Sequence, residues 1–323
     1  MLTKELIQNK NVLIRADLDV PLKEGRVEND FRLKAMLPTI NFCLQYAKKT
    51  IIIGHLGRPE GEDASLSLAP VVETLKSLLN QPIKLIPSGF SPGERWGGES
   101  PLAVMENIRF DPREEKIDRG YANLLAEGAD IYIYESFANY RKSTSLSLIP
   151  EVLPTLTGFR FDLEVEALQK VLTNPLHPTL LLASGAKLDK LEIIKQIEPK
   201  FDQILLGGLL GKPEERTPDG LDLSEETTSL FIKHINEAKT IVINGPVGMY
   251  EDGVHHKATK AIFEAIIASG AYSLAGGGDT LAAIPSLGLS YAPFSFVSTG
   301  GGAMLEFLAT GTHPILEVLK GTK

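Results

Sequence analysis

Short apolar runs alternate with amphipathic stretches along this chain, and the alternation occurs in two consecutive series. Strands that are apolar on both faces and are separated by helices are typical of parallel sheets covered by helices on both sides. The expected strands span 11–18, 49–56, 83–88, 102–110 and 129–137 in the first series, and 178–185, 201–208, 239–246, 271–279 and 294–302 in the second. The sequence therefore predicts the α/β class, with two three-layer domains built on parallel sheets.

The stretch between the two series, residues 153–175, indicates where the domains join. Its apolar residues recur at helical spacing, and Pro154 and Pro175 bracket it. We expect one long interdomain helix over 155–175, joining a first domain at 1–154 to a second at 176–310. The tail at 311–323 is expected to return to the first domain.

The composition of the chain disfavours several classes of binding partner. The chain has 33 basic and 41 acidic residues, a net charge of −8, which disfavours a general binder of nucleic acid or of anionic membranes. Its single cysteine, Cys43, allows no internal disulfide, and charges throughout the first twenty residues do not resemble a signal peptide. With no apolar run long enough to span a bilayer, we expect a cytoplasmic protein.

Two glycine runs follow expected strands of the second series. They are "GGGDT" at 276–280 and "STGGG" at 298–302. Glycines at such positions allow backbone N–H groups to approach a phosphate closely. A single run would fit a tight turn before a helix equally well, but two runs in one sheet favour phosphate. Neither run matches the GxGxxG or GxxxxGK[ST] pattern, which disfavours a dinucleotide-binding dehydrogenase and a P-loop NTPase.

Charged residues near the second-series strands suggest phosphoryl chemistry. Lys187 and Lys190 in "SGAKLDK" would clamp a transferring phosphoryl group and neutralise its charge. The alternative is a solvated pair, although cations at a helix start are unfavourable without an anion. Asp279 would hold Mg²⁺, which takes few protein carboxylates and many phosphate or water oxygens. Alone, this aspartate would more often be a helix N-cap.

Cations gather after the strands of the first series. They are Arg32, His55, Arg58, Arg109 and either Arg141 or Lys142. Each arginine alone would most often be a surface ion pair. Several at equivalent strand ends favour a small anionic substrate, because guanidinium groups bind carboxylate and phosphate through paired hydrogen bonds.

Nine ordered segments, spread from about residue 11 to residue 310, resemble the signature stretches of the phosphoglycerate kinase family. They are "VLIRADLDVPL", "FRLKAMLPTI", "GHLGRPEG", "SLAPV", "ENIRFDPREE", "GAKLDK", "NGPVGMYE", "GGGDT" and "FVSTGGGAMLEFL". The resemblance implies two Rossmann-like domains joined by a long helix and a hinge. It also implies reversible phosphoryl transfer between 1,3-bisphosphoglycerate plus ADP and 3-phosphoglycerate plus ATP, with Mg²⁺ accompanying the nucleotide. We expect a monomer.

The resemblance also assigns site residues. The triose site would contain Asp17, Leu18, Asp19, Arg32, His55, Leu56, Gly57, Arg58, Arg109 and either Arg141 or Lys142. The nucleotide site would contain Lys187, Lys190, Asn244, Glu251, Gly276, Gly277, Gly278, Asp279 and Thr280, with Glu251 meeting the ribose hydroxyls. The catalytic set would be Arg32, Lys187, Gly277 and Gly301. The run from Gly300 to Gly302 would place helix amides at the moving phosphoryl group.

Several positions depart from the family pattern. Asp19 stands where the family has asparagine, and "YRKSTS" at 140–145 replaces "HRAH". "GAKLDK" lacks one residue between its lysines. After "LLGGLLG" at 205–211, a long block of the family is missing. A strand lost with that block would be an edge strand, so we expect an intact core but weaker or less selective recognition of the base.

One alternative is a catalytically silent homologue that binds a nucleotide, and another is a kinase of another small carboxylate. The active kinase is favoured by the joint retention of Arg32, Lys187, Lys190, Glu251 and Asp279. Asp19 and the missing histidines favour the alternatives. His255 and His256 follow "EDG" and resemble a solvated helix start more than a metal site.

Overall fold

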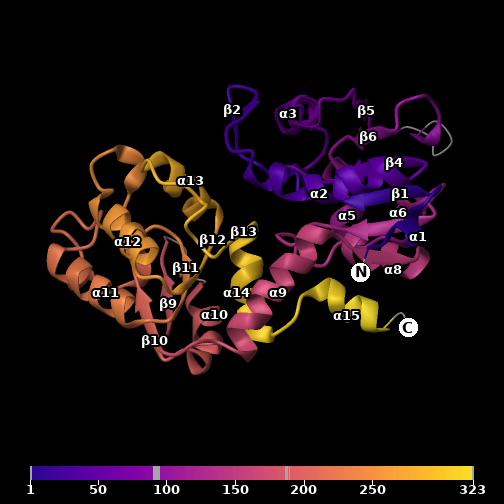
Figure 1. Cartoon of the computed structure of the whole chain (residues 1–323). Coiled ribbons are helices and arrows are strands. Elements are labelled where there is room, and N and C mark those ends of the chain that lie inside the picture. The colour runs from indigo at the N-terminus through magenta and orange to yellow at the C-terminus, as the bar shows by residue number, and fades with distance from the viewer. Residues whose placement is uncertain (1, 90–94, 186–187, 189, 322–323) are drawn as a thin grey trace. The chain divides into compact units, whose positions relative to one another are not determined.

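The structure, a computed structural model, describes residues 2–89, 95–185, 188 and 190–321. The chain divides into two units, one formed by Met1–Leu163 with His313–Lys323 and the other by Glu164–Thr312 (Figure 1). Each unit contains one parallel sheet flanked by helices. The α/β class and the pair of parallel sheets predicted from the sequence are confirmed.

The first unit has a six-stranded sheet in the order β5-β6-β4-β1-β7-β8, and every neighbouring pair is parallel. Its strands are β1 Asn11–Arg15, β4 Lys49–Ile53, β5 Lys84–Ile86, β6 Leu102–Met105, β7 Ile131–Tyr134 and β8 Thr155–Thr157. Its helices are α1 Lys4–Ile7, α2 Phe31–Tyr46, α3 Ala69–Leu79, α5 Arg113–Lys116, α6 Arg119–Ala126, α7 Thr144–Ser147, α8 Ile149–Val152 and α15 Pro314–Gly321, with short 3-10 turns η1 Ala64–Leu66 and η2 Ile108–Phe110.

The core of this unit explains the helix pattern. Val12 and Ile14 of β1 and Ile52 of β4 are fully buried. Helices α2 and α3 direct apolar side chains, among them Ile40 and Leu75, into the same cluster. Because apolar residues at helical spacing form one face of each helix, burying that face against the sheet fixes where α2 and α3 lie.

The helix expected over 155–175 begins later than predicted. Thr155–Thr157 form β8, which pairs with β7, and helix α9 spans Phe159–Thr173. The reason lies in a buried carboxyl group just after β7, that of Glu135, whose pKa burial raises to about 8. Glu135 accepts hydrogen bonds from the backbone N–H groups of Arg160, at 3.1 Å, and Phe161, at 3.3 Å. These bonds satisfy amides of the first helical turn and so fix its start.

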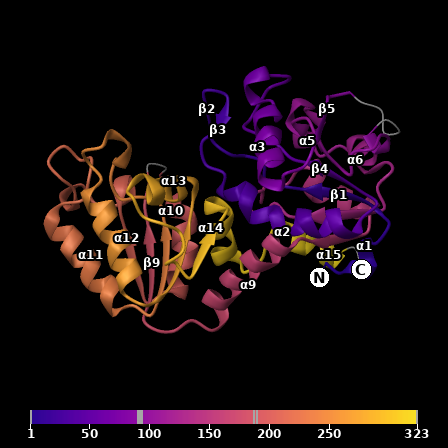
Figure 2. The same cartoon turned by 45° about the horizontal axis from the view of Figure 1, so that its top comes forward.

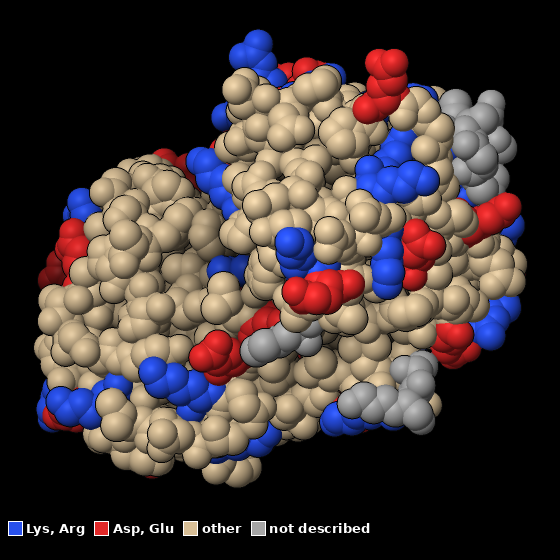
Figure 3. Space-filling model, turned by 45° about the vertical axis from the view of Figure 1, so that its right-hand side comes forward, with Lys and Arg blue, Asp and Glu red and all other residues tan. Residues whose placement is uncertain are grey.

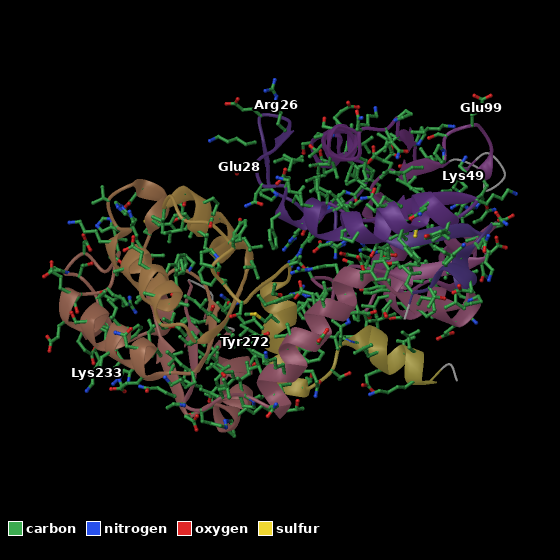
Figure 4. All side chains as sticks on the ribbon, viewed as in Figure 1. Arg26, Glu28, Lys49, Glu99, Lys233 and Tyr272 are labelled. Atoms are coloured by element: carbon green, nitrogen blue, oxygen red, sulfur yellow. The ribbon has the colours of Figure 1, made fainter. Side chains whose placement is uncertain are left out.

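A small hairpin was not anticipated. It pairs β2 Leu22–Lys23 with β3 Arg26–Val27 through a two-residue turn in which both residues have positive φ, 51° at Glu24 and 71° at Gly25. Such a turn matches the twist of a tight hairpin. Arg26 and Glu28 are exposed, and Figure 4 shows their side chains projecting from this segment. Two-residue strands are too short to produce an alternating pattern in the sequence.

The second unit has a five-stranded parallel sheet in the order β10-β9-β11-β12-β13. Its strands are β9 Thr179–Ala183, β10 Gln203–Leu206, β11 Thr240–Asn244, β12 Tyr272–Gly276 and β13 Phe296–Ser298. Its helices are α10 Lys190–Ile197, α11 Glu225–Glu237, α12 Lys257–Ala268, α13 Gly278–Ser286 and α14 Gly301–Thr310, with 3-10 turns η3 Glu198–Lys200, η4 Gly208–Leu210, η5 Pro213–Glu215 and η6 Tyr250–Asp252.

Helices cover both faces of this second sheet. Helix α11 packs against α12, and α10 packs against α14; Figure 2 shows the two pairs on opposite sides of the strands. In the described part of the chain, β10 is an edge strand. An edge position leaves the central strands β9, β11 and β12 fully paired, so the shortened connection after β10 is compatible with an intact sheet.

The expected strands were too long at their carboxyl ends. Residues 271–279 were expected to be extended, but β12 ends at Gly276 and α13 begins at Gly278. Likewise β13 ends at Ser298 and α14 begins at Gly301. The glycine runs therefore form strand-to-helix turns. Glycine carries no side-chain signal, so apolar patterning could not locate the end of either strand.

The end of the chain packs on the first unit through a buried histidine. The Nε2 atom of His313 lies 3.0 Å from the carbonyl oxygen of Phe137, and its ring packs edge-on against Phe161 with centroids 5.1 Å apart. Burial lowers the pKa of His313 to about 4, so the ring is neutral near pH 7 and its Nε2–H donates to that carbonyl.

None of the helices described in the structure combines the length and apolar composition required to cross a lipid bilayer. On the face shown in Figure 3, basic and acidic side chains are interspersed among the residues drawn in colour. That face therefore presents no broad area of a single charge sign, which agrees with the modest net charge of the chain.

Candidate functional site

The first candidate site lies at the carboxyl ends of the strands of the first sheet. Strand β1 has β4 on one side and β7 on the other, so the strand order reverses at β1. Ligands of open α/β sheets bind at such a reversal, beyond the carboxyl ends of the strands. Arg15 ends β1, His55 follows β4, and Arg109 lies in η2, after β6. Parallel pairing brings these three residues to the same edge.

Arg15 and His55 form the centre of this site. Both are buried, with 1% and 6% of their surface exposed. Nη2 of Arg15 lies 2.6 Å from Nδ1 of His55. A guanidinium group can only donate hydrogen bonds, so Nδ1 is the acceptor and the ring proton resides on Nε2. The Nε2 atom lies 3.9 Å from Oδ2 of Asp19.

His55 is held neutral. Its pKa lies well below its ordinary value, first because the ring is buried and then because four arginines surround it, namely Arg15, Arg109, Arg32 and Arg58. Each of these permanent charges disfavours an imidazolium. The same arrangement concentrates positive charge, and carboxylates lie beside it, among them Glu115, whose Oε1 is 3.4 Å from Nε of Arg109. An anionic ligand would relieve the repulsion.

Arg15 was missed by the sequence analysis, and so were the groups that hold it. Its Nε donates to Oγ of Ser145 at 3.0 Å, and that hydroxyl donates to Oε1 of Glu114 at 2.6 Å. Glu114 is buried, which raises its pKa, while the charge of Arg15 opposes the rise. The available signal was a charged residue ending the otherwise apolar run "VLIR". Ser145 lies in "YRKSTS", so this departing segment supports the arginine.

Asp17, Asp19 and Arg32, which were predicted for the triose site, lie beside this pair. Nε of Arg32 lies 3.6 Å from Oδ2 of Asp17, and its Nη1 donates to the backbone carbonyl of Asp19. The carboxylate of Asp19 accepts a hydrogen bond from the backbone N–H of Gly57 at 2.9 Å. Arg109 in turn donates to the carbonyl of Gly57 at 2.7 Å. The loop after β4 is therefore held between Asp19 and Arg109.

The remaining residues predicted for the triose site lie either in the hydrophobic core or on the surface of the first unit. The side chains of Leu18 and Leu56 are buried in the hydrophobic core, so only their backbone atoms can face a ligand. Arg58 is exposed in the loop after β4. Arg141 and Lys142 are both exposed before α7, and their positions do not distinguish which of them would contact a substrate.

The second candidate site lies in the second unit, where the strand order reverses at β9. A cavity of about 330 Å³ opens there, beyond the ends of β9, β10 and β11. Its lining residues are Gly185, Gly208, Leu209, Gly220, Leu221, Pro246, Val247, Gly248, Met249, Glu251 and Asp279. The volume falls at the lower end of the range for small-molecule pockets. Two carboxylates, Glu251 and Asp279, are the acidic groups among these residues.

Asn244, the last residue of β11, braces the strand ends around this cavity. Its Nδ2 donates to the carbonyls of Gly276, at 3.1 Å, and Gly301, at 3.2 Å. Its Oδ1 accepts from Nζ of Lys190 at 3.1 Å, and the same ammonium donates to the carbonyl of Ser184 at 2.9 Å. The buried amide of Asn244 thus links the end of β11 to the end of β12 and the start of α14. Through Lys190 it is also linked to Ser184, the residue after β9.

Gly277 and Gly301 lie in backbone contact. A Cβ atom on Gly301 would approach Cα of Gly277 more closely than two carbon atoms can, and would lie 3.1 Å from its backbone nitrogen. Gly277 itself has φ of 115°, a conformation that residues with side chains rarely adopt. The two glycine runs identified in the sequence therefore meet at one point, which brings the starts of α13 and α14 together.

Both of these helices present their N-terminal amides to the same end of the sheet. The first turn of an α-helix leaves N–H groups without intrahelical partners, and these attract anions. Thr280 fixes the start of α13, since its Oγ1 donates to the carbonyl of Gly276 at 2.9 Å and accepts from Gly245 N at 2.7 Å. Glu164 fixes the turn before α14 by accepting hydrogen bonds from the backbone N–H and Oγ1 of Thr299, at 2.7 and 2.9 Å.

Asp279 is not the N-cap of α13, because Gly277 holds that position. The aspartate is exposed in the first turn and lines the cavity. Among the described residues, no group of three or more His, Cys, Asp or Glu side chains is arranged to hold a metal ion. A single carboxylate fits the binding of Mg²⁺ that arrives with a polyphosphate, since such Mg²⁺ keeps mostly phosphate and water ligands.

Two further predictions concern the surroundings of the cavity. Lys187, assigned to catalysis and to nucleotide binding, lies outside the described residues.

The shortened connection after β10 does not leave the cavity without a wall. Leu209, Leu221 and Met249 line the cavity and are 50%, 39% and 51% exposed, an unusual concentration of accessible apolar side chains that suits the face of a planar ring.

Comparison with known proteins identifies the family. The family model described as "Phosphoglycerate kinase" matches residues 2–213 and 211–311. The chain belongs to the phosphoglycerate kinase family. Its relatives include phosphoglycerate kinases of Thermomicrobium roseum, 32% identical with 97% of each chain covered, and of Thermus thermophilus, 32% identical with 97% of this chain and 98% of the relative covered.

Solved structures agree with this family assignment. The phosphoglycerate kinase of Coxiella burnetii is 29% identical, with a TM-score of 0.79, and covers 98% of this chain and 97% of its own. That of Pyrococcus horikoshii is 25% identical, with a TM-score of 0.86 and the same coverage. Phosphoglycerate kinases are phosphotransferases, so the predicted family and enzyme class are confirmed.

The comparisons also bear on the shortened connection. The alignment with the Thermomicrobium enzyme extends over 383 positions, whereas this chain has 323 residues. The family model matches in two segments that meet at residues 211–213. The difference in length supports a deletion, and the junction of the two matched segments places it directly after η4, where the sequence pattern indicated one.

Proposed function

We propose that this chain catalyses reversible phosphoryl transfer between 1,3-bisphosphoglycerate plus ADP and 3-phosphoglycerate plus ATP, the phosphoglycerate kinase step of glycolysis. The observation that carries the proposal is the convergence of four arginines on a neutral, buried His55 at the carboxyl edge of the first sheet. A small molecule with a carboxylate and a phosphate is the kind of ligand that such a cluster binds.

In this proposal the first unit binds the triose. Arg32, Arg58 and Arg109 would bind its anionic groups, while Arg15 orients His55. Because Nδ1 of His55 is occupied by Arg15, its Nε2–H is the group available to donate to a substrate oxygen. Asp17 and Asp19 would hold Arg32 and the Gly57 backbone in place.

The second unit would bind the nucleotide. The apolar side chains Leu209, Leu221 and Met249 would contact the base, and Glu251 the ribose hydroxyls. Gly277, Gly278 and Thr280 would present amides of the α13 start to phosphate oxygens. Asp279 is the carboxylate that would meet the Mg²⁺ of a Mg-nucleotide, which supplies charge neutralisation to the polyphosphate when bound.

Transfer itself needs no covalent intermediate on the protein. Arg32 and Lys187 would neutralise charge on the transferring group, and the amides at Gly301 would bind its oxygens. Exclusion of water protects the acyl phosphate from hydrolysis. We include in the proposal hinge bending between the two units, a monomeric state and a cytoplasmic location, as the family resemblance and the sequence imply.

A coupled assay with 3-phosphoglycerate and MgATP tests the proposal. We expect turnover by the intact chain, and a loss of about a hundredfold or more in kcat for Lys187→Ala, because that variant lacks a charge that stabilises the transferring group. Arg26→Ala is the matched control, since it removes an exposed cation from the β2–β3 hairpin. Absence of turnover by the intact chain would refute the proposal.

A further inference from the structure

The segment that follows the shortened connection forms one wall of the cavity in the second unit. We define it as the 216–223 loop. An isolated antiparallel bridge joins Arg216 to Leu223 at its ends. Inside it, the backbone N–H of Thr217 donates to the carbonyl of Asp222 at 2.9 Å. Gly220 and Leu221, at its tip, line the cavity.

The neighbouring wall comes from the segment after β11. Met249 and Glu251 line the cavity there, and Glu251 lies in η6. The backbone N–H of Met249 donates to the carbonyl of Leu221 at 2.9 Å, which joins the two walls. The size of the cavity therefore depends on how firmly the 216–223 loop is held against residues 249–256.

A histidine bridges the two walls. Nε2 of His255 lies 2.9 Å from Oδ2 of Asp219 in the 216–223 loop, and Nδ1 lies 2.5 Å from Oδ2 of Asp252 in η6. Both carboxylates are oriented by other donors. Oδ1 of Asp219 accepts from Thr217 Oγ1 at 2.6 Å and from Leu221 N at 3.1 Å; Oδ1 of Asp252 accepts from Val254 N at 2.7 Å and from His255 N at 2.9 Å.

The bridge requires a proton on each ring nitrogen. Carboxylates only accept hydrogen bonds, so contact with both aspartates requires the imidazolium, whereas a neutral ring can donate to one of them. The two aspartates raise the pKa of His255, and the pKa of each aspartate is lowered to about 2. The other titratable groups nearby are Asp222, buried in the same loop, and His256 at the start of α12.

We propose that His255 is a positioning residue for the nucleotide, whose protonated ring holds the 216–223 loop against η6 and so keeps the cavity formed. This inference rests on the proposed function and adds a pH-dependent nucleotide affinity to it. His255 lies just before α12, as expected for a solvated helix start, and its two aspartate contacts add a link that the sequence did not indicate.

The expected effect is modest. His255 is partly exposed, and exposed ion pairs contribute little, so the expected change in affinity is about fivefold at most. A ligand that binds only the formed cavity loses apparent affinity in proportion to the fraction of molecules in which it is formed. We therefore expect roughly a two- to fivefold weakening when the ring loses its second proton.

The test is equilibrium binding of MgADP to the full chain by calorimetry at about pH 6 and about pH 8.5, on either side of the range in which a carboxylate-paired histidine titrates. ADP and Mg²⁺ carry their own pH dependence, so the comparison is with His255→Gln, which keeps one amide donor but cannot titrate. The quantity compared is the pH ratio, defined as the dissociation constant at about pH 8.5 divided by that at about pH 6. We expect the pH ratio to be roughly two- to fivefold larger for the intact chain than for His255→Gln.

Two further variants make the outcome decisive. Asp219→Asn keeps the loop backbone but removes the charge at the far end of the bridge, and it should reduce the pH ratio to that of His255→Gln. His234→Gln on α11 removes a histidine that lies 3.9 Å from Glu237, and neither residue lines the cavity, so this variant should behave as the intact chain. Equal ratios for the intact chain, His255→Gln and Asp219→Asn would overturn the inference.

Binding and turnover separate the two proposals. If MgADP binds with the expected pH ratio but the chain does not turn over 3-phosphoglycerate and MgATP, the inference stands and the proposed function fails. If the chain turns over but the ratio is unaffected by the variants, the function stands and the inference fails. Thermal unfolding of each variant at both pH values shows whether the fold is retained; if His255→Gln unfolds, Asp219→Asn decides.

Discussion

Gly301 lies so close to Gly277 that a single added methyl group would overlap the backbone of the other glycine loop. We predict that Gly301→Ala separates the starts of α13 and α14. The overlap should cost about 1–3 kcal/mol of unfolding free energy, a value typical of overpacking. It should also lower kcat about tenfold or more, since amides aimed at a transferring group lose effect when displaced.

Gly278→Ala is the stability control for this prediction. It lies in the first turn of α13, as Gly301 does in α14, but a Cβ at Gly278 meets no atom within 4 Å. Denaturant unfolding should therefore show a loss for Gly301→Ala and little change for Gly278→Ala. Similar unfolding free energies for both variants would show that the backbone contact is not what constrains residue 301.

The second prediction concerns Arg15. Lysine keeps the positive charge but lacks the planar fork in which Nη2 contacts His55 Nδ1 and Nε contacts Ser145 Oγ. We expect Arg15→Lys to raise the KM for 3-phosphoglycerate roughly tenfold, because His55 loses the donor that fixes its tautomer and orientation. The KM for MgATP should stay unchanged in steady-state assays. Arg26→Lys, at an exposed position of the hairpin, is the control. A parallel rise in both KM values would contradict a role of Arg15 that is confined to the triose site.

The third prediction addresses Asp19, which departs from the family asparagine. Its Oδ1 accepts a hydrogen bond from Gly57 N at 2.9 Å, and an asparagine oxygen can accept the same bond. Asp19→Asn therefore removes a negative charge near the anionic substrate without removing the loop contact. We expect the KM for 3-phosphoglycerate to fall about fivefold, corresponding to about 1 kcal/mol for one charge at a partly exposed site. An unchanged KM would mean that the positive charges of Arg32 and Arg109 already offset the negative charge of Asp19.

Much of the fold could be predicted because its signals are local. Each of the ten expected strands occurs, since runs such as "KTIII" are buried on both faces and carry a continuous apolar pattern. The glycine runs were informative for a different reason. Close backbone contact between Gly277 and Gly301 excludes side chains at those positions, so the requirement is visible in the sequence.

The parts that were not predicted depend on contacts between distant residues. Ser145 is separated from Arg15 by 130 positions and from Glu114 by 31, and no spacing rule relates them. The bridge from His255 to Asp219 spans 36 positions and is likewise nonlocal. Helix α9 started late because Glu135, 25 residues before Arg160, supplies the acceptor for its first turn.

The last prediction concerns acid stability and His313. Burial lowers the pKa of this ring to about 4 in the folded state, compared with about 6.5 in an unfolded chain. Between these two values the unfolded state binds a proton that the folded state does not, so folding stability falls as the pH drops through this window. From pH 7 to pH 5, this single group should reduce the unfolding free energy by about 2 kcal/mol.

His313→Gln isolates that contribution. Its side-chain amide can donate to the Phe137 carbonyl as Nε2–H does, but it does not titrate. Buried His55 also has a lowered pKa, and its contribution is common to both proteins and cancels in the difference. Denaturant unfolding at about pH 7 and about pH 5 should therefore show a loss that is smaller by about 2 kcal/mol for His313→Gln than for the intact chain. Equal losses would mean that His313 is protonated without unfolding, for example because the contact of α15 with the first unit opens at low pH.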